Sequence, residues 1–325
     1  MIARQVLVYY AWSRPGESGA PLHVIEDRFP ALFESRRMGF PRFHEFADPH
    51  AFDQGIAGFL DHIMKHNFTA FVDLASALTG QRVIEVERVA DDGTPKPLDT
   101  RALDGIDTLI VISFDSCRTA QKATDNEIEA VRAFLANTDH LAFVCPHHDI
   151  GEVGDLSGDE ALQRQIEEFE HHGDKTLPPR QGFGGFARSL LAGLGVPVEN
   201  RFGLRPACAE NGAPAPIEAE TALDRLKLLE NVPHFNLHAH LPQLDRHGEA
   251  AARLDVLARQ RIDLDAPPHP FTRERATFDA LLQSREDAFA GTLCVSDATL
   301  WSSTASGVDS LRRFWTNVVQ RPLRH

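Results

Sequence analysis

Two short, largely apolar runs constrain the fold of this chain more than any other feature. They are "IDTLIVISF" (106–114) and "LAFVC" (141–145), and a segment with helical spacing lies between them. A continuous apolar run is typical of a strand that is covered on both faces. A strand, a helix and a second strand in this order predict a parallel sheet with right-handed crossovers.

The segment between these runs is the clearest helix of the chain, expected over 123–138. Thr124 can accept a hydrogen bond from the backbone of the first turn, and Glu127, three residues later, can reach back to the helix start. This reciprocal capping box predicts where the helix begins.

The flanking segments continue the alternation. Before residue 100 we expect a buried strand at 5–12, a helical stretch at 51–80 and a strand with one wet face at 81–89. The second half is less regular. Its expected elements are a helix at 186–196, a Pro/Ala-rich and then helical stretch at 205–228, strands at 232–240 and within 291–303, and a last helix at 307–320.

Together these elements predict an α/β fold with a doubly wound, mostly parallel sheet flanked by helices. Because no linker composition separates two units, we expect one domain over residues 1–325. Inserted segments are expected at about 153–230 and 245–288.

The composition of the chain limits the classes of binding partner that we expect. The formal net charge is −14, whereas a nucleic-acid surface needs clustered Lys and Arg, so neither nucleic acid nor an anionic membrane is expected as a partner. The N-terminus lacks the features of a secretory signal, and no run is long enough to span a bilayer. The four cysteines form no CxxC pair and no disulfide framework. We expect a cytoplasmic protein with a small-molecule substrate, and homo-oligomerisation stays open.

The ends of the predicted strands locate the candidate site, because ligands of open parallel sheets bind outside the carboxyl ends of the strands. Three of these ends supply imidazole, thiol or carboxylate groups together. The candidate catalytic residues are Cys145, His147 and Asp149, and the candidate metal ligands are His148, His238 and His240. The alternative is that such residues cap helices and satisfy turns.

A divalent metal, zinc or iron, is the cofactor that these residues suit, because both ions accept imidazole and carboxylate ligands. Side chains at i and i+2 of a strand share a face, so His238 and His240 can reach one ion if 232–240 is a strand. A metal-bound water would have a lowered pKa and could hydrolyse a substrate.

The order of elements that ends in Cys145 resembles the class I glutamine amidotransferase-like superfamily. The ending "GTLCVSDATLWSS" followed by "LRRFWTNVV" is similar to the glycine–strand–Asp–helix ending of many of its non-amidotransferase members. The resemblance covers roughly 1–150 and 290–320. It implies a flavodoxin-like sheet and a nucleophilic cysteine on a tight turn at the place of Cys145.

The chain departs from that superfamily at the turn itself. Val144 and Pro146 stand where the family has glycines, and Pro146 lacks the N–H that an oxyanion hole needs. The family's histidine–proline–glutamate signature is also missing. His147, His148 and Asp149 are therefore stronger candidates for the functional residues than the Cys145 thiol.

A second resemblance concerns "PHHDIGE" (146–152), which is similar to the Pro-His-Pro-Asp-Asp-Glu motif of zinc-dependent N-acetylglucosaminyl deacetylases. His147 and Asp149 match that motif, which implies a zinc ligand and a base. Ile150 replaces the second aspartate, and this removes a ligand.

The segment 181–195 places glycines before a helix, and these glycines are interpreted as a flexible entry or lid, with anion binding as the alternative. Phe183, Trp12 and Trp301 are candidates for an apolar wall of a ligand site, and core packing is the alternative for each.

The sequence thus favours a small-molecule enzyme, a hydrolase of a C–N or related polar bond with a His/Asp site that may hold a metal. Two alternatives remain: a non-catalytic small-molecule-binding or scaffold module of the same fold, and an iron-dependent oxidoreductase at the same histidines.

Overall fold

The fold is built on an eight-stranded sheet whose parallel half continues into an antiparallel half. The computed structural model describes residues 4–18, 65–115, 119–147, 157–163, 166, 183–238, 240–266, 270–303 and 308–323. The strand order is β2-β1-β3-β4-β10-β9-β8-β6. The parallel strands are β1 (Val6–Ser13), β2 (Ile84–Val89), β3 (Thr108–Ser113), β4 (Leu141–Pro146) and β10 (Thr292–Ser296). The antiparallel strands are β9 (Thr277–Ser284), β8 (Leu254–Arg261) and β6 (Glu218–Ala219).

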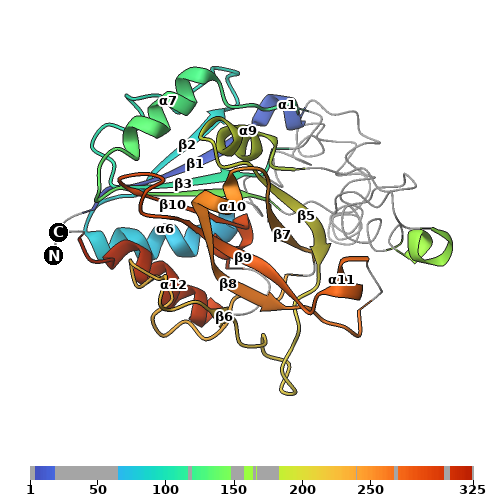
Figure 1. Cartoon of the computed structure of the whole chain (residues 1–325). Coiled ribbons are helices and arrows are strands. Elements are labelled where there is room, and N and C mark those ends of the chain that lie inside the picture. Colours follow the sequence, from blue (N-terminus) through green and yellow to red (C-terminus); the bar gives the residue numbers. More distant parts are fainter. Residues whose placement is uncertain are drawn as a thin grey trace, which may run out of the picture.

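Helices cover both faces of the parallel half (Figure 1). On one face lie α7 (Asp125–Phe134) and α9 (Gly185–Gly193), and on the other lie α6 (Lys65–Thr79) and α12 (Val308–Gln320). The shorter helices are α1 (Arg14–Ser18), α10 (Ala250–Arg253), α11 (Pro270–Glu274) and η3 (Ala298–Trp301). The predicted α/β class is confirmed, since a mostly parallel central sheet is flanked by helices.

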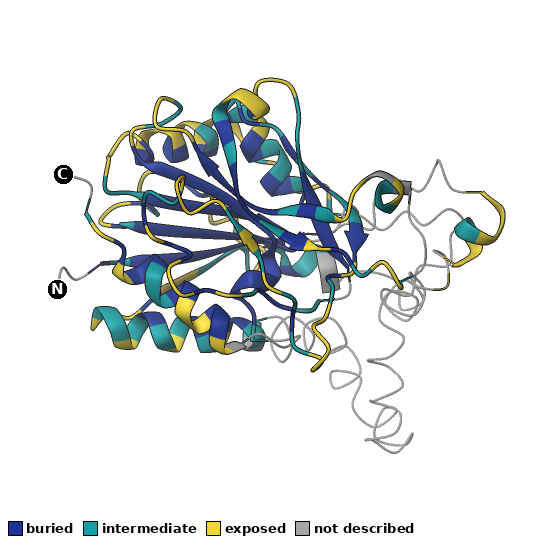
Figure 2. Ribbon diagram, turned by 60° about the horizontal axis from the view of Figure 1, so that its bottom comes forward, coloured by how far each residue is buried: buried dark blue, intermediate teal, exposed yellow. Residues whose placement is uncertain are grey.

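The parallel strands β1, β3, β4 and β10 are buried on both sides, as their apolar runs predict, whereas the edge strand β2 is partly exposed. Along β1, alternate residues enter two different cores. Val6, Val8, Tyr10 and Trp12 pack with residues of α6 and α12. Leu7, Tyr9 and Ala11 pack with residues of α7 and α9. Figure 2 shows the strands buried and the exposed residues gathered on loops and on the outer sides of the helices.

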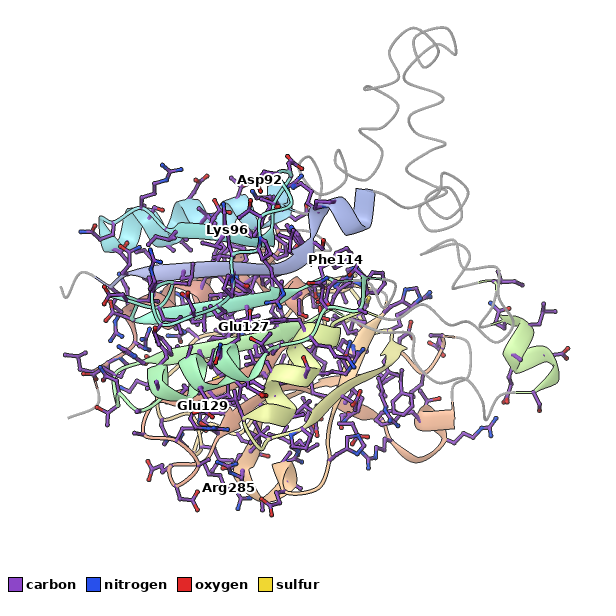
Figure 3. The ribbon with its side chains drawn as sticks, turned by 90° about the horizontal axis from the view of Figure 1, so that it is seen from above. Asp92, Lys96, Phe114, Glu127, Glu129 and Arg285 are labelled. Carbon is purple, nitrogen blue, oxygen red and sulfur yellow. The ribbon has the colours of Figure 1, made fainter. Side chains whose placement is uncertain are left out.

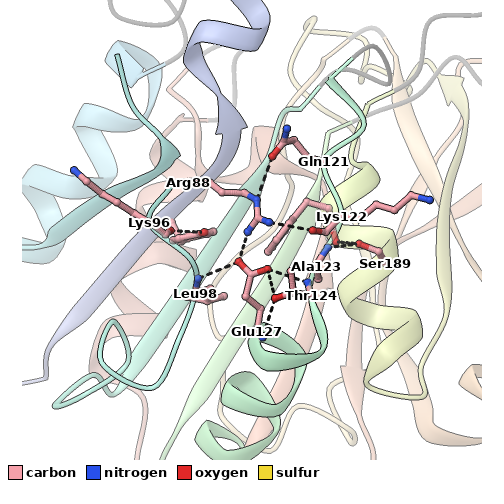
Figure 4. Close-up of polar contacts among 11 residues, drawn as sticks. Arg88, Lys96, Leu98, Gln121, Lys122, Ala123, Thr124, Glu127 and Ser189 are labelled. Carbon is pink, nitrogen blue, oxygen red and sulfur yellow. Dashed lines mark hydrogen bonds and ion pairs between the residues drawn. The ribbon is translucent and has the colours of Figure 1, made fainter. Parts of the chain in front are cut away.

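The predicted capping box of α7 is confirmed. The Thr124 Oγ1 accepts from the Glu127 N–H at 3.3 Å, and Glu127 accepts from the Thr124 N–H at 2.9 Å. Glu127 also accepts from Arg88 and from the Leu98 N–H (Figure 4). Burial alone would raise the pKa of Glu127, but the bond from Thr124 and the charge of Arg88 bring it below its ordinary value.

In the second half of the chain α9, β10 and α12 are confirmed, and other segments differ from the sequence prediction. Residues 205–228 form turns and β6 rather than a helix, because the Asp224 carboxylate accepts from the N–H groups of Leu228 and Leu229, and Lys227 has a left-handed φ of 54°. The predicted insertion 245–288 supplies β8 and β9 to the central sheet. These antiparallel pairings are made between distant segments, and the apolar pattern of each segment alone does not specify them.

The strand predicted at 232–240 is not found either, since the described residues 232–238 and 240 form no strand. A short separate sheet pairs β5 (Val198–Leu204) with β7 (Leu241–Arg246), and β7 begins only after His240. His238 and His240 therefore lie in the segment that enters a strand, so the same-face argument from strand geometry does not apply to them.

Both termini lie at the end of the sheet opposite to α1 (Figure 1). Arg321 anchors the C-terminal segment there, since its buried guanidinium donates to the Thr108 hydroxyl at 2.7 Å and to the Asp107 carbonyl at 2.9 Å. Burial lowers the pKa of Arg321 to about 9. Of the helices that the structure describes, none is long and apolar enough to cross a membrane.

Candidate functional site

The candidate site lies at the carboxyl ends of β3 and β4, where His147 directly follows β4. The His147 N–H donates to the Ser113 carbonyl at 2.9 Å and so extends the β3–β4 pairing by one residue. His147 is 6% exposed. Backbone pairing and burial therefore place this imidazole at the edge where a parallel sheet binds its ligands.

Two phenylalanines surround the imidazole. The Phe114 ring centroid lies 4.0 Å from that of His147, and the Phe183 centroid lies 5.5 Å from it. The two phenyl rings stack on each other at 5.0 Å. Figure 3 shows Phe114 at the end of β3. Phe183 lies beside His147 but is only 1% exposed, and it belongs to the same buried core cluster as Trp12 and Trp301.

His238 meets His147 in space although the two are far apart in the sequence. Their ring centroids are 6.3 Å apart and the ring planes cross at 76°. The Nδ1 of His238 accepts from the His240 N–H at 3.4 Å, and the His238 N–H donates to Asn236 at 3.4 Å. Since Nδ1 is an acceptor, a neutral His238 carries its proton on Nε2 and presents it as a donor.

His240 is 4% exposed and lies two residues beyond His238. Within the described part of the chain, no group of three or more His, Cys, Asp and Glu side chains is placed to hold a metal ion. His148 and Asp149, which complete the predicted constellation, lie outside the described residues. Of the predicted site residues, the structure brings together the candidate catalytic His147 and the candidate ligand His238 through their rings, and His240 contacts His238 through its backbone N–H.

Cys145 points into the core instead of the candidate site. It is fully buried, its sulfur accepts from the Trp301 indole N–H at 3.1 Å, and it lies 3.4 Å from the Ser296 hydroxyl. Burial raises the pKa of the Cys145 thiol to about 12, although the bonds from Ser296 and Trp301 oppose the change. A nucleophilic thiol needs the opposite environment, one that lowers its pKa.

The carboxylates at two other strand ends cap helices. Asp115, which follows β3 and is 1% exposed, accepts from the Phe186 N–H in the first turn of α9 at 3.0 Å. Asp297, which follows β10, accepts from the Thr299 N–H of η3 at 2.7 Å. At these two ends the structure matches the alternative interpretation, in which polar residues after strands satisfy helix termini.

The glycine-rich segment before α9 is held in the same way. The Gly184 N–H donates to the Asp115 carbonyl at 3.1 Å, and the Ser113 hydroxyl accepts from the Ala187 N–H at 3.0 Å. Gly184 has φ of +81°, and a Cβ there would lie 2.8 Å from the Cβ of Pro146. Three amides at the start of α9, those of Gly184, Phe186 and Ala187, are therefore already bound to Asp115 and Ser113.

A buried ion cluster stands at the neighbouring end of β1. Glu87 accepts from both Nε and Nη2 of Arg14, at 2.8 and 2.7 Å, from the Trp12 indole at 3.0 Å and from Lys65 at 2.9 Å. Burial would raise the pKa of Glu87, but these donors bring it down to about 2. The strand-end residue Arg14 thus serves as an internal partner of Glu87.

Two polar residues of the site are not apparent in the sequence. Asn200 in β5 donates to the His147 carbonyl, and Arg188 in α9 donates to the Asn200 Oδ1 at 2.6 Å. An asparagine in a strand and an arginine on a helix are ordinary in isolation, so only the contact between distant segments marks them.

Comparison with known proteins adds no relative from which a role can be transferred. The chain matches no protein-family model, and no curated protein matches its sequence. The fold and the site thus define the chain as an α/β protein with an imidazole pair at the carboxyl edge of its parallel strands.

Proposed function

We propose that this protein is a small-molecule enzyme that hydrolyses a C–N or related polar bond by acid–base chemistry at His147 and His238. The observation that carries the proposal is the meeting of the two imidazoles, with ring centroids 6.3 Å apart, beside Phe114 and Phe183. Imidazole is the side chain that most readily exchanges a proton near neutral pH.

The order of the five parallel strands supports the location of this site. The order β2-β1-β3-β4-β10 corresponds to that of flavodoxin-like, doubly wound sheets, in which the strand order reverses between the first and third strands. Ligands of such sheets bind outside the carboxyl ends near that reversal. Phe114 follows β3 and His147 follows the neighbouring β4, so both lie at this edge.

The tautomer of His238 supports a role as the general acid, with His147 as the general base. His147 accepts a proton from a water molecule, whose oxygen attacks the carbon of the C–N bond. As that bond breaks, the Nε2–H of His238 protonates the departing nitrogen. Water is consumed, a carboxylic acid and an amine are released, and the proton that His147 gained passes through solvent to Nε2 of His238, which restores the pair. The phenyl rings of Phe114 and Phe183 supply the apolar wall that ligand sites usually have.

A metal-bound form of the same proposal uses the two imidazoles as ligands of zinc or iron. Catalytic zinc usually has three protein ligands, so this form requires one more than the pair described here. Iron at the same pair would support an oxidoreductase. Cys145 is assigned to the core in either form, because its sulfur is buried beneath Trp301.

Hydrolysis of two probes, p-nitrophenyl acetate and p-nitroacetanilide, tests the proposal. We expect His147→Gln and His238→Gln each to lower kcat/KM about 100-fold, the lower end of the usual range for general acid–base catalysis. His140→Gln is the matched control. Its Nδ1 contacts the Phe134 carbonyl at 2.8 Å, just before the opposite end of β4, so the rate should not change.

The same assay separates the alternatives. If the wild type hydrolyses both probes no faster than His147→Gln, hydrolysis is refuted and a binding module becomes the better interpretation. If EDTA abolishes activity and Zn²⁺ restores it, the metal-bound form is correct. Activity that depends on Fe²⁺ and O₂ would assign the oxidoreductase.

A further inference from the structure

We propose that Asn200 is a positioning residue that holds the His147 imidazole against Phe183 by tying together the backbones of both residues. The inference deepens the proposed function, on which it rests only in taking His147 as the reacting group. Asn200 lies in β5 and contributes from a segment that packs beside the parallel sheet but does not belong to it.

The Asn200 amide contacts both backbones at once. Its Nδ2 donates to the His147 carbonyl and to the Phe183 carbonyl, the latter at 3.3 Å. The residue is 1% exposed. The two residues that it joins have rings in contact, with centroids 5.5 Å apart. A single buried amide thus sets the separation of the segment that follows β4 from the segment that begins α9.

Arg188 determines which way this amide faces. One guanidinium nitrogen, Nη1, donates to the Asn200 Oδ1 at 2.6 Å and to the Phe183 carbonyl at 2.6 Å. An arginine cannot accept a hydrogen bond, so the amide oxygen must face Arg188 and the amide nitrogen must face the two carbonyls. The donor that reaches His147 is therefore oriented by a charge on α9.

Strand pairing does not explain this amide. Asn200 is opposite Leu244 in the β5–β7 pair, and that pairing uses backbone groups alone. Burying a carboxamide is unfavourable unless its hydrogen bonds are made, and an apolar residue would serve the strand equally well. The contacts of Asn200 instead converge on His147 and Phe183. Residues that orient a functional imidazole through its surroundings commonly change activity 10–100-fold when replaced.

The test is Asn200→Asp, which keeps the oxygen that faces Arg188 and removes both donors to the carbonyls. The readout is the NMR resonances of the His147 ring protons, which the adjacent Phe114 and Phe183 rings displace from their positions in the unfolded chain. We expect the Asn200→Asp resonances to move at least halfway toward those of the chain in urea. For p-nitrophenyl acetate we expect kcat to fall about tenfold with little change in KM.

The matched control is Asn317→Asp. The Asn317 Nδ2 also donates to two backbone carbonyls, those of Leu228 and Glu230, at 3.0 and 2.8 Å, but on α12. A role limited to stability predicts that both variants lower the melting temperature and that neither moves the His147 resonances. The positioning role predicts that Asn200→Asp alone moves them.

If Asn200→Asp does not fold, Arg188→Gln provides the second variant. It removes the charge that orients the amide and should move the same resonances in the same direction by a smaller amount. Unmoved resonances in a folded Asn200→Asp or Arg188→Gln protein overturn the inference, whatever the rates. Conversely, full activity of His147→Gln removes the proposed function and leaves the NMR result intact, so the two failures are distinguishable.

Discussion

Two helices on the same face of the sheet, α7 and α9, differ in how the free backbone N–H groups of their first turns are hydrogen-bonded. The first turn of α7 is capped by its own sequence, because Thr124 and Glu127 bond to each other's backbone. The first turn of α9 begins at Gly184, which has no side chain, and its donors bond to Ser113 and Asp115 from the end of β3.

The difference teaches how a glycine-rich loop before a helix should be interpreted. Such a loop presents backbone donors, and an external anion is one way to satisfy them. In α9 the internal carboxylate of Asp115 does so instead, and this contact joins the helix to the sheet beside His147. The cap of α7 is local, yet it also has a distant partner, because Arg88 from β2 bonds to Glu127.

The substitution with the largest expected effect tests whether the cap of α7 also depends on its distant partner Arg88. Glu127→Ala should lower the free energy of unfolding by about 4 kcal/mol, since it removes the capping carboxylate and leaves Arg88 without the buried partner of its charge. Urea unfolding measures the loss. Glu129→Ala, on the same helix but exposed, should cost less than about 0.5 kcal/mol. A small loss at Glu127 would show that α7 depends on its apolar face alone.

The same carboxylate makes this loss depend on pH. The pKa of Glu127 is lower in the folded state than its ordinary value of about 4.3, so the unfolded chain binds the proton more tightly. Its contribution is complete above the ordinary pKa and disappears as the pH falls through the lower folded pKa. Stability measured from about pH 6 to 3 should therefore fall more steeply in the wild type than in Glu127→Gln. Parallel curves would contradict this.

The next effect concerns the glycine of α9. Gly184→Ala should destabilise the fold by about 3 kcal/mol, because alanine is disfavoured at a φ of +81° and its Cβ would overlap Pro146. Gly212→Ala is the control, since Gly212 has φ of +77° but nothing within 4 Å of its added Cβ. If the two variants lose equal stability, the contact with Pro146 contributes nothing.

Removal of the cap supplied by the sheet should have a smaller effect. Asp115→Ala should cost about 2 kcal/mol, the upper end for a helix cap, because the lost oxygen is buried. Hydrogen exchange should then show faster exchange of the Phe186 and Ala187 amides, with α7 unchanged. Equal acceleration in both helices would mean that Asp115 stabilises the whole domain rather than α9.

The smallest effect is expected at the local cap. Thr124→Ala should cost about 1 kcal/mol, since Glu127 keeps its bonds to the Thr124 backbone, Leu98 and Arg88. Thr124→Ser keeps the hydroxyl and should restore most of the loss in thermal unfolding. A failure of serine to restore stability would assign the effect to the threonine methyl group.

The same contrast explains what could be predicted from the sequence. The strands β1, β3, β4 and β10 and the helix α7 were predicted from continuous apolar runs and from a capping box, which are properties of adjacent residues. The antiparallel pairing of β8 with β9 is not specified by either apolar pattern, and His238 lies outside any strand although the pattern predicts one there. The conformation of each of these segments depends on a partner far away in the chain.

The candidate site shows the same difference between features that adjacent residues determine and features that distant contacts determine. The sequence alone placed His147 at the end of a buried strand, because an apolar run followed by polar residues marks such an end. That His238 lies beside it, that Asn200 holds its carbonyl, that Asp115 is used by α9 and that Cys145 faces the core were decided by the tertiary structure. The physical reason is that hydrogen bonds and burial depend on which residues are close in space, whereas the sequence shows only which residues are close along the chain.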